Sequence, residues 1–492
     1  MAILTLRQGQ QVTQVTFDAP APLSDVLARS SVSIGQPCGG RGVCGKCAVV
    51  LDGDVSPPNA AERRCGVRLA CQAVILGNTQ VTLPMLLPMT QIAGGTVADL
   101  IPAAPMPGRF GAAVDVGTTT LALLLYDLSS GRCIGAASML NPQTAVAADV
   151  IGRIDASMKG QGDALQRQVT SAIGTLIASA CAQAQIPSDQ VDALVVTGNT
   201  TMLYLLTGRD PTPLSRAPFQ ADCFFGTEAD LLSRRAYLPD CLHAFVGADT
   251  TCALLTAGMM ESPETTLLCD VGTNGELALW HQGQLYIAST AAGPAFEGAG
   301  ISCGCGSVPG AIDRVEVTGY QIICHTIGDC KAVGICGSGL VDAIAVMLNT
   351  ESIDESGFLE DEEFPLRDGI ALKQEDIRAV QLAKAATHAG IMSLLSAAGC
   401  AAADVTRVYL AGGFGSHLNL QSAVRIGLIP EELADKVKVI GNAALDGAAL
   451  LLMDTKKRGR VSGMRALARH VRLDGNPEFA NRYIEAMLFG EE

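Results

Sequence analysis

The stretch Pro37-Cys-Gly-Gly-Arg-Gly-Val-Cys-Gly-Lys-Cys47, answered by Leu69-Ala-Cys71-Gln, decides the fold of the N-terminal part of the chain. It spaces Cys38, Cys44, Cys47 and Cys71 as C-x5-C-x2-C-x23-C. The glycines between the thiols permit positive φ and let backbone N–H groups point at sulfide. A C-x4-C-x2-C…C run binds a plant-type [2Fe–2S] cluster, and here the first gap is one residue longer. The spacing therefore predicts one [2Fe–2S] cluster held by these four thiolates.

Other interpretations of the same stretch have to be weighed. Residues 40–45 match a dinucleotide fingerprint and residues 40–47 nearly match a P-loop. A P-loop needs a hydroxyl on Mg²⁺, where Cys47 offers a soft thiol. A Rossmann motif needs a helix after its third glycine, but Cys47 leads into the strand-like Ala-Val-Val-Leu. Zinc remains the alternative metal, although zinc knuckles usually use two CxxC pairs and one is present here. Cys65 remains an alternative to Cys71 as fourth ligand.

Composition limits the function classes. The chain has 492 residues, 48% of them hydrophobic, and a formal net charge of −15, which argues against nucleic acid and anionic membranes as partners. No apolar run approaches the roughly 18 residues of a membrane span. The first residues alternate like a strand rather than forming a signal peptide. Seventeen cysteines without a secretion signal predict a reducing cytoplasm, and favour an anaerobic one.

The N-terminal segment has the strand order of a small mixed α+β domain. We expect strands at residues 2–8, 11–17, 48–51, 72–76 and 79–83, and a helix at 23–29. This order resembles a β-grasp ferredoxin and predicts a domain over residues 1–84. Residues 85–108 are rich in proline, which predicts a stiff linker.

An internal repeat organises the rest, residues 109–492. Asp115-Val-Gly-Thr and Asp270-Val-Gly-Thr lie 155 residues apart, and each follows an apolar strand and precedes another. The spacing predicts two duplicated subdomains, the second starting near residue 265. Turns of this kind expose N–H and hydroxyl groups to phosphate, while the Asp at the strand end holds hydrated Mg²⁺. A third glycine stretch, residues 408–419, again follows an apolar strand.

These three motifs, in this order, resemble those of the ASKHA superfamily of acetate and sugar kinases, Hsp70 and actin. The resemblance implies a two-subdomain, ribonuclease H-like α/β ATPase, with phosphate-1 at 115–120, phosphate-2 at 270–276 and adenosine at 410–415. It also makes residues 334–342 look like the connecting helix of the second half. Mg²⁺ is expected at Asp115 and Asp270. The expected nucleotide-binding residues are Asp115, Gly117, Thr118, Thr119, Thr120, Asp270, Gly272, Thr273, Asn274, Gly275, Gly412, Gly413 and Phe414.

Two carboxylates are candidates for catalysis. Asp249 precedes Asp270 by 21 residues, where ASKHA kinases keep the carboxylate that activates the attacking oxygen. The alternative for Asp249 is a helix N-cap before Thr-Thr-Cys-Ala. Glu276 is expected to add a carboxylate to the Mg²⁺ shell. The cysteines between Cys303 and Cys336 suggest either a second metal site or small buried hydrophobes.

A ferredoxin fused to an ASKHA ATPase resembles the reductive activators of corrinoid proteins. Residues 141–143, 149–154, 197–202, 292–304 and 441–448 also look like that family. The resemblance implies ATP-dependent return of one electron to Co(II), giving Co(I) in a methyltransferase system. It implies a corrinoid protein and an upstream low-potential electron donor as partners, and leaves a homodimer open. Longer members carry a linker and a middle region before the ATPase, whereas here we expect only residues 85–108 in between.

The energetics agree with this resemblance. Plant-type clusters have potentials near −400 mV, and each 100 mV uphill costs about 2.3 kcal/mol for one electron. Nucleotide coupling of ~1–3 kcal/mol is ordinary. The alternatives are an activator of the 2-hydroxyacyl-CoA dehydratase type, which lacks a ferredoxin domain, and an ASKHA small-molecule kinase, which has no use for an electron carrier.

Overall fold

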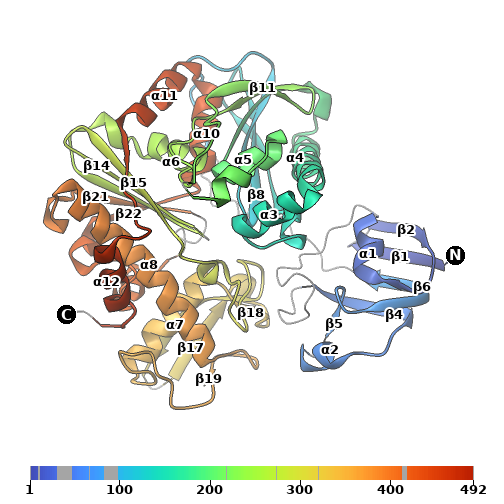
Figure 1. Cartoon of the computed structure of the whole chain (residues 1–492). Coiled ribbons are helices and arrows are strands. Elements are labelled where there is room, and N and C mark those ends of the chain that lie inside the picture. The colour runs from blue at the N-terminus through green and yellow to red at the C-terminus, as the bar shows by residue number, and fades with distance from the viewer. Residues whose placement is uncertain are drawn as a thin grey trace.

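The computed structural model describes residues 2–8, 11–29, 47–65, 67–82, 98–217, 219–272, 274–319, 321–412 and 418–490 (Figure 1). The predicted ligands Cys38 and Cys44, and the predicted nucleotide-binding residues Thr273, Gly413 and Phe414, lie outside these ranges. Among the described helices, none is long and apolar enough to cross a membrane.

The N-terminal domain is a mixed sheet with strand order β2-β1-β6-β4-β5, and β3 pairs with β6. Helix α1 buries Leu23, Val26 and Leu27 against Leu4 and Ile75 of the sheet, which closes a small core. This arrangement confirms the β-grasp prediction. The elements are β1 (Ala2–Gln8), β2 (Gln11–Phe17), β3 (Ala21–Pro22), α1 (Leu23–Arg29), β4 (Ala48–Val55), α2 (Ala60–Cys65), β5 (Arg68–Leu69) and β6 (Val74–Thr82).

One strand prediction in this domain is wrong. The two strands expected at 72–76 and 79–83 form the single strand β6, although Gly77-Asn78 reads as a turn. β6 pairs with β1 on one side and β4 on the other, so ladder hydrogen bonds outweigh the local turn preference. A Cβ on Gly77 would lie 2.5 Å from Oδ2 of Asp54. A larger residue at position 77 would therefore have to displace the Asp54 side chain.

The first half of the second domain is a sheet of order β11-β12-β10-β7-β8-β9. β7, β8 and β9 form an antiparallel meander, and β10 and β12 add parallel strands on the other side of β7. Its elements are β7 (Phe110–Val116), β8 (Thr120–Asp127), β9 (Cys133–Leu140), α3 (Val150–Ala156), α4 (Gly162–Ala184), β10 (Val191–Gly198), α5 (Thr200–Thr207), β11 (Thr227–Leu231), β12 (Arg234–Leu238) and α6 (Ala248–Ala257).

The second half repeats this topology with order β22-β21-β13-β14-β15-β23. β13, β14 and β15 form the meander, and β21 and β22 are the parallel additions. β7 and β13 therefore occupy equivalent places in the two sheets, and each begins one of the two Asp-Val-Gly-Thr hairpins. The elements are β13 (Thr266–Val271), β14 (Gly275–His281), β15 (Gln284–Thr290), α8 (Gln374–Ala398), β21 (Arg407–Ala411), α9 (Leu420–Arg425), β22 (Val437–Gly441), α10 (Ala443–Met453), α11 (Arg458–Leu467), β23 (Ala468–His470) and α12 (Pro477–Glu485).

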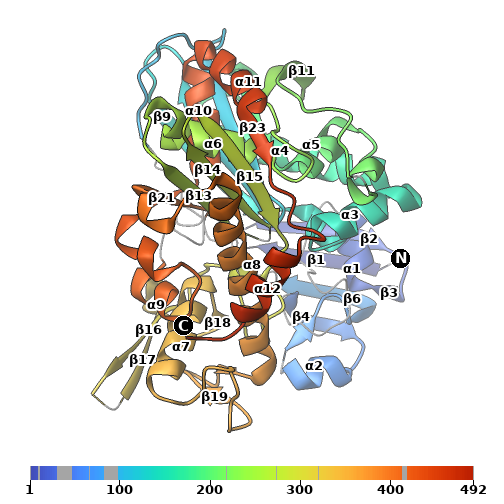
Figure 2. The ribbon, with the colours of Figure 1, turned by 60° about the vertical axis from the view of Figure 1, so that its left-hand side comes forward.

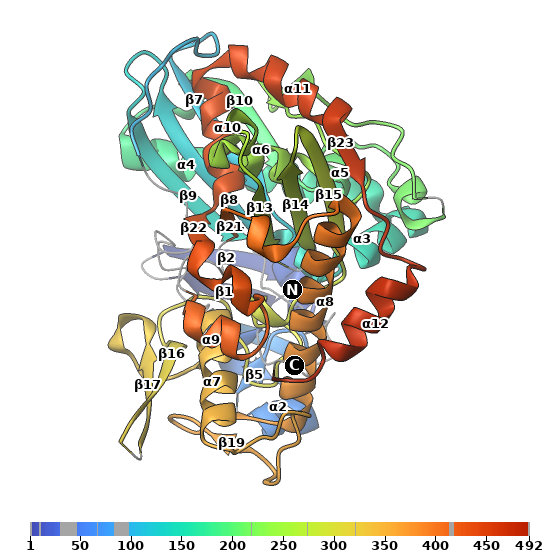
Figure 3. The same ribbon diagram turned by 90° about the vertical axis from the view of Figure 1, so that its left-hand side faces the viewer.

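Helix α8 packs along β14 and β15, as Figure 2 shows. Figure 3 shows the C-terminal segment passing from α11 through β23, which pairs with β15, to α12 on α8. An insertion between β15 and α8 contains β16 (Ala311–Thr318), β17 (Gln321–Thr326), β18 (Gly334–Ile335), α7 (Gly337–Asn349), β19 (Phe364–Pro365) and β20 (Ala371–Leu372).

The helices that join the two halves are α6 and α10, which pack closely on each other. A Cβ on Gly447 of α10 would lie 2.1 Å from the carbonyl oxygen of Cys252 in α6, so the crossing requires glycine there. The expectation that residues 334–342 form the connecting helix is wrong. Residues 334–335 form β18 and residues 337–342 begin α7, which packs on β16 of the insertion and on α9.

Part of the segment expected as a linker packs on the second domain. The N–H groups of Ala103 and Ala104 donate to the carbonyl oxygen of Met453, and the N–H of Met106 donates to that of Leu452. The Met106 side chain is 1% exposed, within the core that α10 also enters. The proline-rich composition therefore gives an extended chain that follows the end of α10.

Candidate active site

Two of the four predicted cluster ligands lie side by side. Cys47 immediately precedes β4, and Cys71 lies in the turn between β5 and β6. The N–H of Ala70 donates to the carbonyl oxygen of Cys47 at 2.8 Å, which brings the two segments together. The Sγ atoms of Cys47 and Cys71 are 3.2 Å apart. Two thiols this close can serve as ligands of one iron ion. Of the four predicted ligands, the two that the structure describes therefore fit a shared iron site.

A buried carboxylate holds the turn that carries Cys71. Glu62 in α2 is 1% exposed, and its Oε1 accepts from the N–H of Leu69 at 3.0 Å and from Nε of Arg68 at 2.9 Å. Its Oε2 accepts from the N–H of Asn59 at 2.9 Å. Although burial raises the pKa of Glu62, these hydrogen bonds outweigh it and leave the pKa below its usual value. The carboxylate is therefore charged at neutral pH and fixes the backbone next to Cys71.

The first predicted phosphate hairpin connects β7 and β8. A Cβ on Gly117 would lie 2.5 Å from the carbonyl oxygen of Thr120, so this tight turn requires glycine. Nδ2 of Asn141 donates to the carbonyl oxygen of Gly117 at 2.8 Å, and Nη2 of Arg153 donates to that of Thr118 at 2.6 Å. Both donors hold the turn through its backbone, as a phosphate-binding loop requires.

The second predicted hairpin connects β13 and β14 and carries Asp270, Gly272, Asn274 and Gly275. Gly412, at the end of β21, has φ of +96°, and a Cβ there would lie 2.8 Å from Oδ1 of Asp270. The predicted adenosine loop and the predicted Mg²⁺ carboxylate therefore meet. Glycine is needed at 412 both for its backbone conformation and for that close approach.

Carboxylates from both hairpins and from α6 act on one another across the space between the halves. Burial raises the pKa of Asp115 to about 7, and repulsion from Asp249 adds to the rise. Burial raises the pKa of Asp270 to about 7, with repulsion from Asp249 and Asp115. Burial, followed by repulsion from Asp249 and Asp270, raises the pKa of Glu276 well above its usual value. A site that gathers this much negative charge fits a divalent cation.

No three Cys, His, Asp or Glu side chains of the described residues come close enough to bind one ion directly. Mg²⁺ in proteins usually keeps several waters and takes further oxygens from nucleotide phosphates. Direct all-protein coordination is typical of zinc and calcium sites instead.

Asp249 lies at the start of α6, but it is not the N-cap. The N-cap is Gly247, and Asp249 is the second helical residue, with Oδ1 accepting from the N–H of Thr250 at 2.8 Å. The N-cap alternative is therefore wrong. Burial raises the pKa of Asp249 to about 6, although hydrogen bonds with Thr250 oppose the rise. A carboxylate with this pKa, placed among the others, can orient a water or accept its proton.

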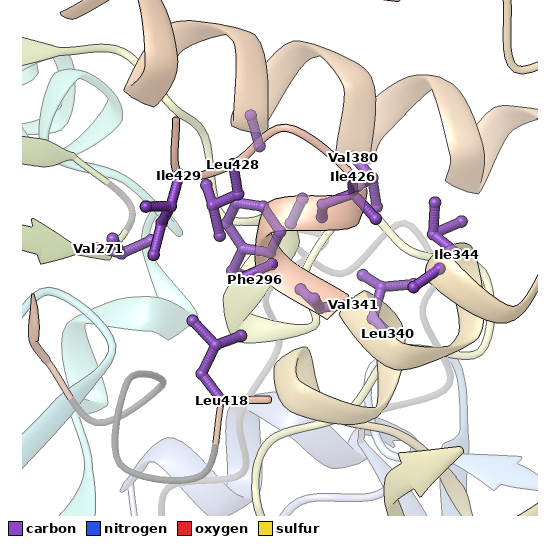
Figure 4. Packing of buried hydrophobic residues seen from close by; sticks show 14 of the residues in the cluster. Val271, Phe296, Leu340, Val341, Ile344, Val380, Leu418, Ile426, Leu428 and Ile429 are labelled. Atoms are coloured by element: carbon purple, nitrogen blue, oxygen red, sulfur yellow. The ribbon is translucent and has the colours of Figure 1, made fainter. Parts of the chain in front are cut away.

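Two side-chain hydrogen bonds link the halves at this site. Nδ2 of Asn442, at the start of α10, donates to Oδ2 of Asp115 at 3.1 Å. Oγ1 of Thr119 donates to Oε2 of Glu297 in the second half. Phe296, 2% exposed, packs among Val341, Leu428 and Ile429 and so fixes the backbone that carries Glu297 (Figure 4).

Comparison with known proteins places this arrangement in a family. Three family models match: "2Fe-2S iron-sulfur cluster binding domain" over residues 8–76, "RACo middle region" over 110–262 and "C-terminal domain of RACo the ASKHA domain" over 264–492. The corrinoid activation enzyme RamQ of Eubacterium limosum is 33% identical over 440 residues, which are 81% of this chain and 74% of RamQ. The chain belongs to the corrinoid activation enzymes.

Two further relatives agree with this membership. The [Co(II) methylated amine-specific corrinoid protein] reductase of Methanosarcina barkeri is 26% identical over 418 residues, 76% of each chain. The solved structure of a reductive activator for corrinoid, iron–sulfur protein superposes with a TM-score of 0.72 at 26% identity, covering 99% of this chain and 98% of that one.

The family models correct one expectation. The middle region expected to be missing is present, because residues 110–262 match it. They form the first half of the duplicated pair, so in this family member the middle region supplies Asp115, Asp249 and the first phosphate hairpin. The two predicted phosphate hairpins therefore lie in two different family domains.

Sequence reasoning missed several residues that contact the predicted hairpins. Glu297 and Asn442 lie in stretches that resembled the family, but neither had been assigned a role. Nδ2 of Asn199 donates to Oγ1 of Thr118 at 3.0 Å. Arg153 is fully buried, and burial lowers its pKa to about 10. The available signal was that some of these polar residues lie beside a glycine-rich stretch. The sequence does not show the partner of such a residue, because that partner is far away along the chain.

The cysteines between 303 and 336 do not form a second metal site within the described residues. Burial and the nearby carboxylate of Asp376 raise the pKa of Cys303 to about 12, which keeps it a thiol. Cys324 and Cys336 are buried among apolar side chains. The interpretation as small buried hydrophobes fits these two, whereas Cys303 and Cys305 are half-buried and Cys330 is exposed.

Proposed function

We propose that this chain reduces Co(II) in a corrinoid protein to Co(I), using one electron from a [2Fe–2S] cluster and energy from ATP. The observation that carries the proposal is that this chain of the activator family combines the adjacent thiols of Cys47 and Cys71 with buried carboxylates, Asp115 and Asp270, on two repeated hairpins. An electron carrier and an ATPase in one chain are what an uphill one-electron transfer requires.

The cluster is proposed on Cys38, Cys44, Cys47 and Cys71, and it supplies a low-potential one-electron donor when bound. Substituting Cys71 by Ser is expected to lose or perturb the cluster, whereas Cys65→Ser is expected to keep it. Two irons per chain and an unchanged visible spectrum in Cys65→Ser support the assignment. Four irons per chain, or cluster loss in Cys65→Ser alone, contradicts it.

The nucleotide is proposed to bind between the hairpins as Mg·ATP. Asp115 and Asp270 would hold the hydrated Mg²⁺, and Asp249 would orient the attacking water toward the γ-phosphate. Glu276 lies opposite Asp270 in the β13–β14 register and would complete the carboxylate shell around the ion. Mg²⁺ would relieve the mutual repulsion that raises the pKa values of these carboxylates.

Nucleotide binding is proposed to change how the two halves are joined. Thr119 donates to Glu297, and Asn442 donates to Asp115, so both hydrogen bonds link the two halves. A phosphate bound at the first hairpin competes with the Glu297 carboxylate for the Thr119 hydroxyl. Binding and hydrolysis can therefore bias the relative position of the halves without touching the cluster.

The proposed partners are a corrinoid protein and an upstream low-potential electron donor. Seventeen cysteines favour a reducing cytoplasm as the location. We expect the ATPase to be slow alone and faster with a Co(II) corrinoid protein, because the partner would favour the arrangement in which the two halves are closed around the nucleotide.

The deciding experiment follows Co(I) formation by absorption under anoxic conditions, with a low-potential reductant and with or without ATP. Cys38→Ser should bind ATP and reduce no cobalt. Asp115→Ala should accept electrons and deliver none to cobalt. If Co(I) forms equally fast without ATP, the activator function is wrong and a small-molecule kinase becomes the better hypothesis.

A further inference from the structure

The amide of Gln72 lies against a predicted cluster ligand. Its Nε2 is 3.7 Å from Sγ of Cys71 and 3.3 Å from the carbonyl oxygen of the same residue. An NH₂ group has two hydrogens, so it can donate to both acceptors. The side chain is partly buried, in the turn between β5 and β6.

The orientation of this amide is fixed by a chain of hydrogen bonds that begins at a backbone donor. The N–H of Glu62 donates to Oδ1 of Asn59 at 3.0 Å, and a backbone N–H can only donate. Nδ2 of Asn59 therefore faces away from that N–H and donates to Oε1 of Gln72 at 2.9 Å. Gln72 consequently presents Nε2, and not its oxygen, to Cys71.

The cap at Asn59 is itself held in place. Asn59 and Glu62 exchange the two hydrogen bonds of a capping box at the start of α2, and Glu62 also binds the backbone of Leu69. The helix start, the amide of Gln72 and the turn with Cys71 therefore form one connected polar network. Such a network gives the amide a defined direction relative to the sulfur.

We propose that Gln72 is a positioning residue that sets the reduction potential of the cluster through an N–H···S hydrogen bond to Cys71, with Asn59 fixing its direction. Hydrogen bonds to cluster sulfurs are among the factors that set the potential. Adding one electron increases the negative charge on the ligand sulfurs, so a donor there stabilises the reduced form more than the oxidised form. The hydrogen bond therefore raises the potential.

The direction of this effect matters for the reaction. A higher potential makes it easier for the upstream donor to load one electron, but leaves a larger uphill step to Co(II), which the ATPase has to cover. Gln72 thus affects how the potential difference between the upstream donor and Co(II) is divided between two steps. The first step reduces the cluster, and the second transfers the electron from the cluster to Co(II).

The experiment is an anoxic redox titration of the cluster-loaded full chain, followed by electron paramagnetic resonance of the reduced cluster. Gln72→Leu removes the donor and is expected to shift the midpoint potential to a more negative value. Gln14→Leu, at an exposed position on β2 of the same sheet, is the matched control and is expected to leave the potential unchanged.

Asn59→Asp is the sharper variant, because it keeps the Oδ1 acceptor of the helix cap but loses the donor to Gln72. The amide of Gln72 is then expected to turn over, donate to the new carboxylate and present its oxygen to Cys71. The potential should become more negative, with α2 retained. Because an added charge alone also lowers a potential, the same substitution is made in the Gln72→Leu background.

The double variant separates the two causes. If Asn59→Asp acts through the amide, it shifts the potential much less in the Gln72→Leu background than in the parent. An equal shift in both backgrounds, or an unchanged potential in Gln72→Leu, overturns the proposal.

The inference rests on the proposed ligation by Cys71 but not on corrinoid reduction. The titration contains neither ATP nor a corrinoid protein, and iron content is measured first on every variant. If Cys71→Ser retains a normal cluster, the ligand assignment has failed. If the cluster assignment holds while all potentials are equal, the hydrogen-bond role alone has failed.

Discussion

Asp270→Asn is expected to abolish ATP hydrolysis and, at the same time, to stabilise the nucleotide-free protein above neutral pH. In the folded protein burial first, and then repulsion from Asp249 and Asp115, raises the pKa of Asp270 from 3.8 to about 7. A raised carboxyl pKa means that folding is favoured while the group is neutral, and that this stability is lost as the pH rises through about 7. An amide carries no charge at any of these pH values, so the variant avoids the loss.

The magnitude follows from the two pKa values. They differ by about three pH units, and each unit corresponds to about 1.4 kcal/mol, so full desolvation gives an upper limit of about 4 kcal/mol. The carboxylate is partly exposed, so water screens the repulsion. We therefore expect a gain of about 1–2 kcal/mol at pH 8. Below about pH 4 the gain should vanish, because the carboxyl is then neutral in the folded and unfolded chain.

The assay is thermal unfolding by circular dichroism between pH 5 and pH 8, without nucleotide or Mg²⁺. Asp361→Asn, at an exposed carboxylate of the insertion, is the control, and its difference in melting temperature from the parent should not change with pH. Adding Mg·ATP should raise the melting temperature of the parent but not of Asp270→Asn. If Asp270→Asn is less stable than the parent at pH 8, or if its advantage does not grow with pH, the account of repulsion among the buried carboxylates is refuted.

Two further predictions use single contacts between parts of the fold. The rings of His243, before α6, and His470, on β23, are stacked with centroids 3.7 Å apart, and burial followed by repulsion from His470 lowers the pKa of His243 to about 4. The stability from neutral His243 is present above about pH 6.5 and is lost as the pH falls toward 4, so His243→Phe should gain in melting temperature relative to the parent as the pH is lowered; a constant difference would contradict this. At the α6–α10 crossing, Gly447→Ala should cost about 1–3 kcal/mol in urea unfolding, because the new Cβ meets the carbonyl of Cys252 at 2.1 Å. Gly459→Ala in α11, where a Cβ has nothing within 4 Å, should instead stabilise by about 0.5–1 kcal/mol, and equal effects at the two sites would refute the packing argument.

Much of the fold could be predicted because its signals are local or repeated. The cysteine spacing and the strand order around it identified the β-grasp domain. The Asp-Val-Gly-Thr repeat located two hairpins whose strands have the same topology in both halves. A tight turn needs particular residues within a few positions, so a short stretch of sequence is enough to predict it.

The sequence failed where a neighbouring segment outweighs a local preference. Gly77-Asn78 has the composition of a turn, yet β6 runs through it because strands on both sides pair with it. The proline-rich stretch near Met106 has the composition of a linker, yet it packs on α10. Residues 334–342 have the glycines of a crossing helix, but the crossing is made by Gly447, whose requirement depends on the position of α6.

The amino-acid sequence alone defined which groups are present: thiols spaced for a cluster, and two carboxylates at strand ends beside predicted phosphate turns. Only the tertiary structure decided how these groups act on one another. Asp115 meets Asn442, 327 positions away, and Thr119 meets Glu297, 178 positions away. Gln72 faces Cys71 with its nitrogen because Asn59 holds its oxygen. Spacing along a chain defines local turns, but repulsion between carboxylates and the direction of an amide depend on distances that exist only after folding.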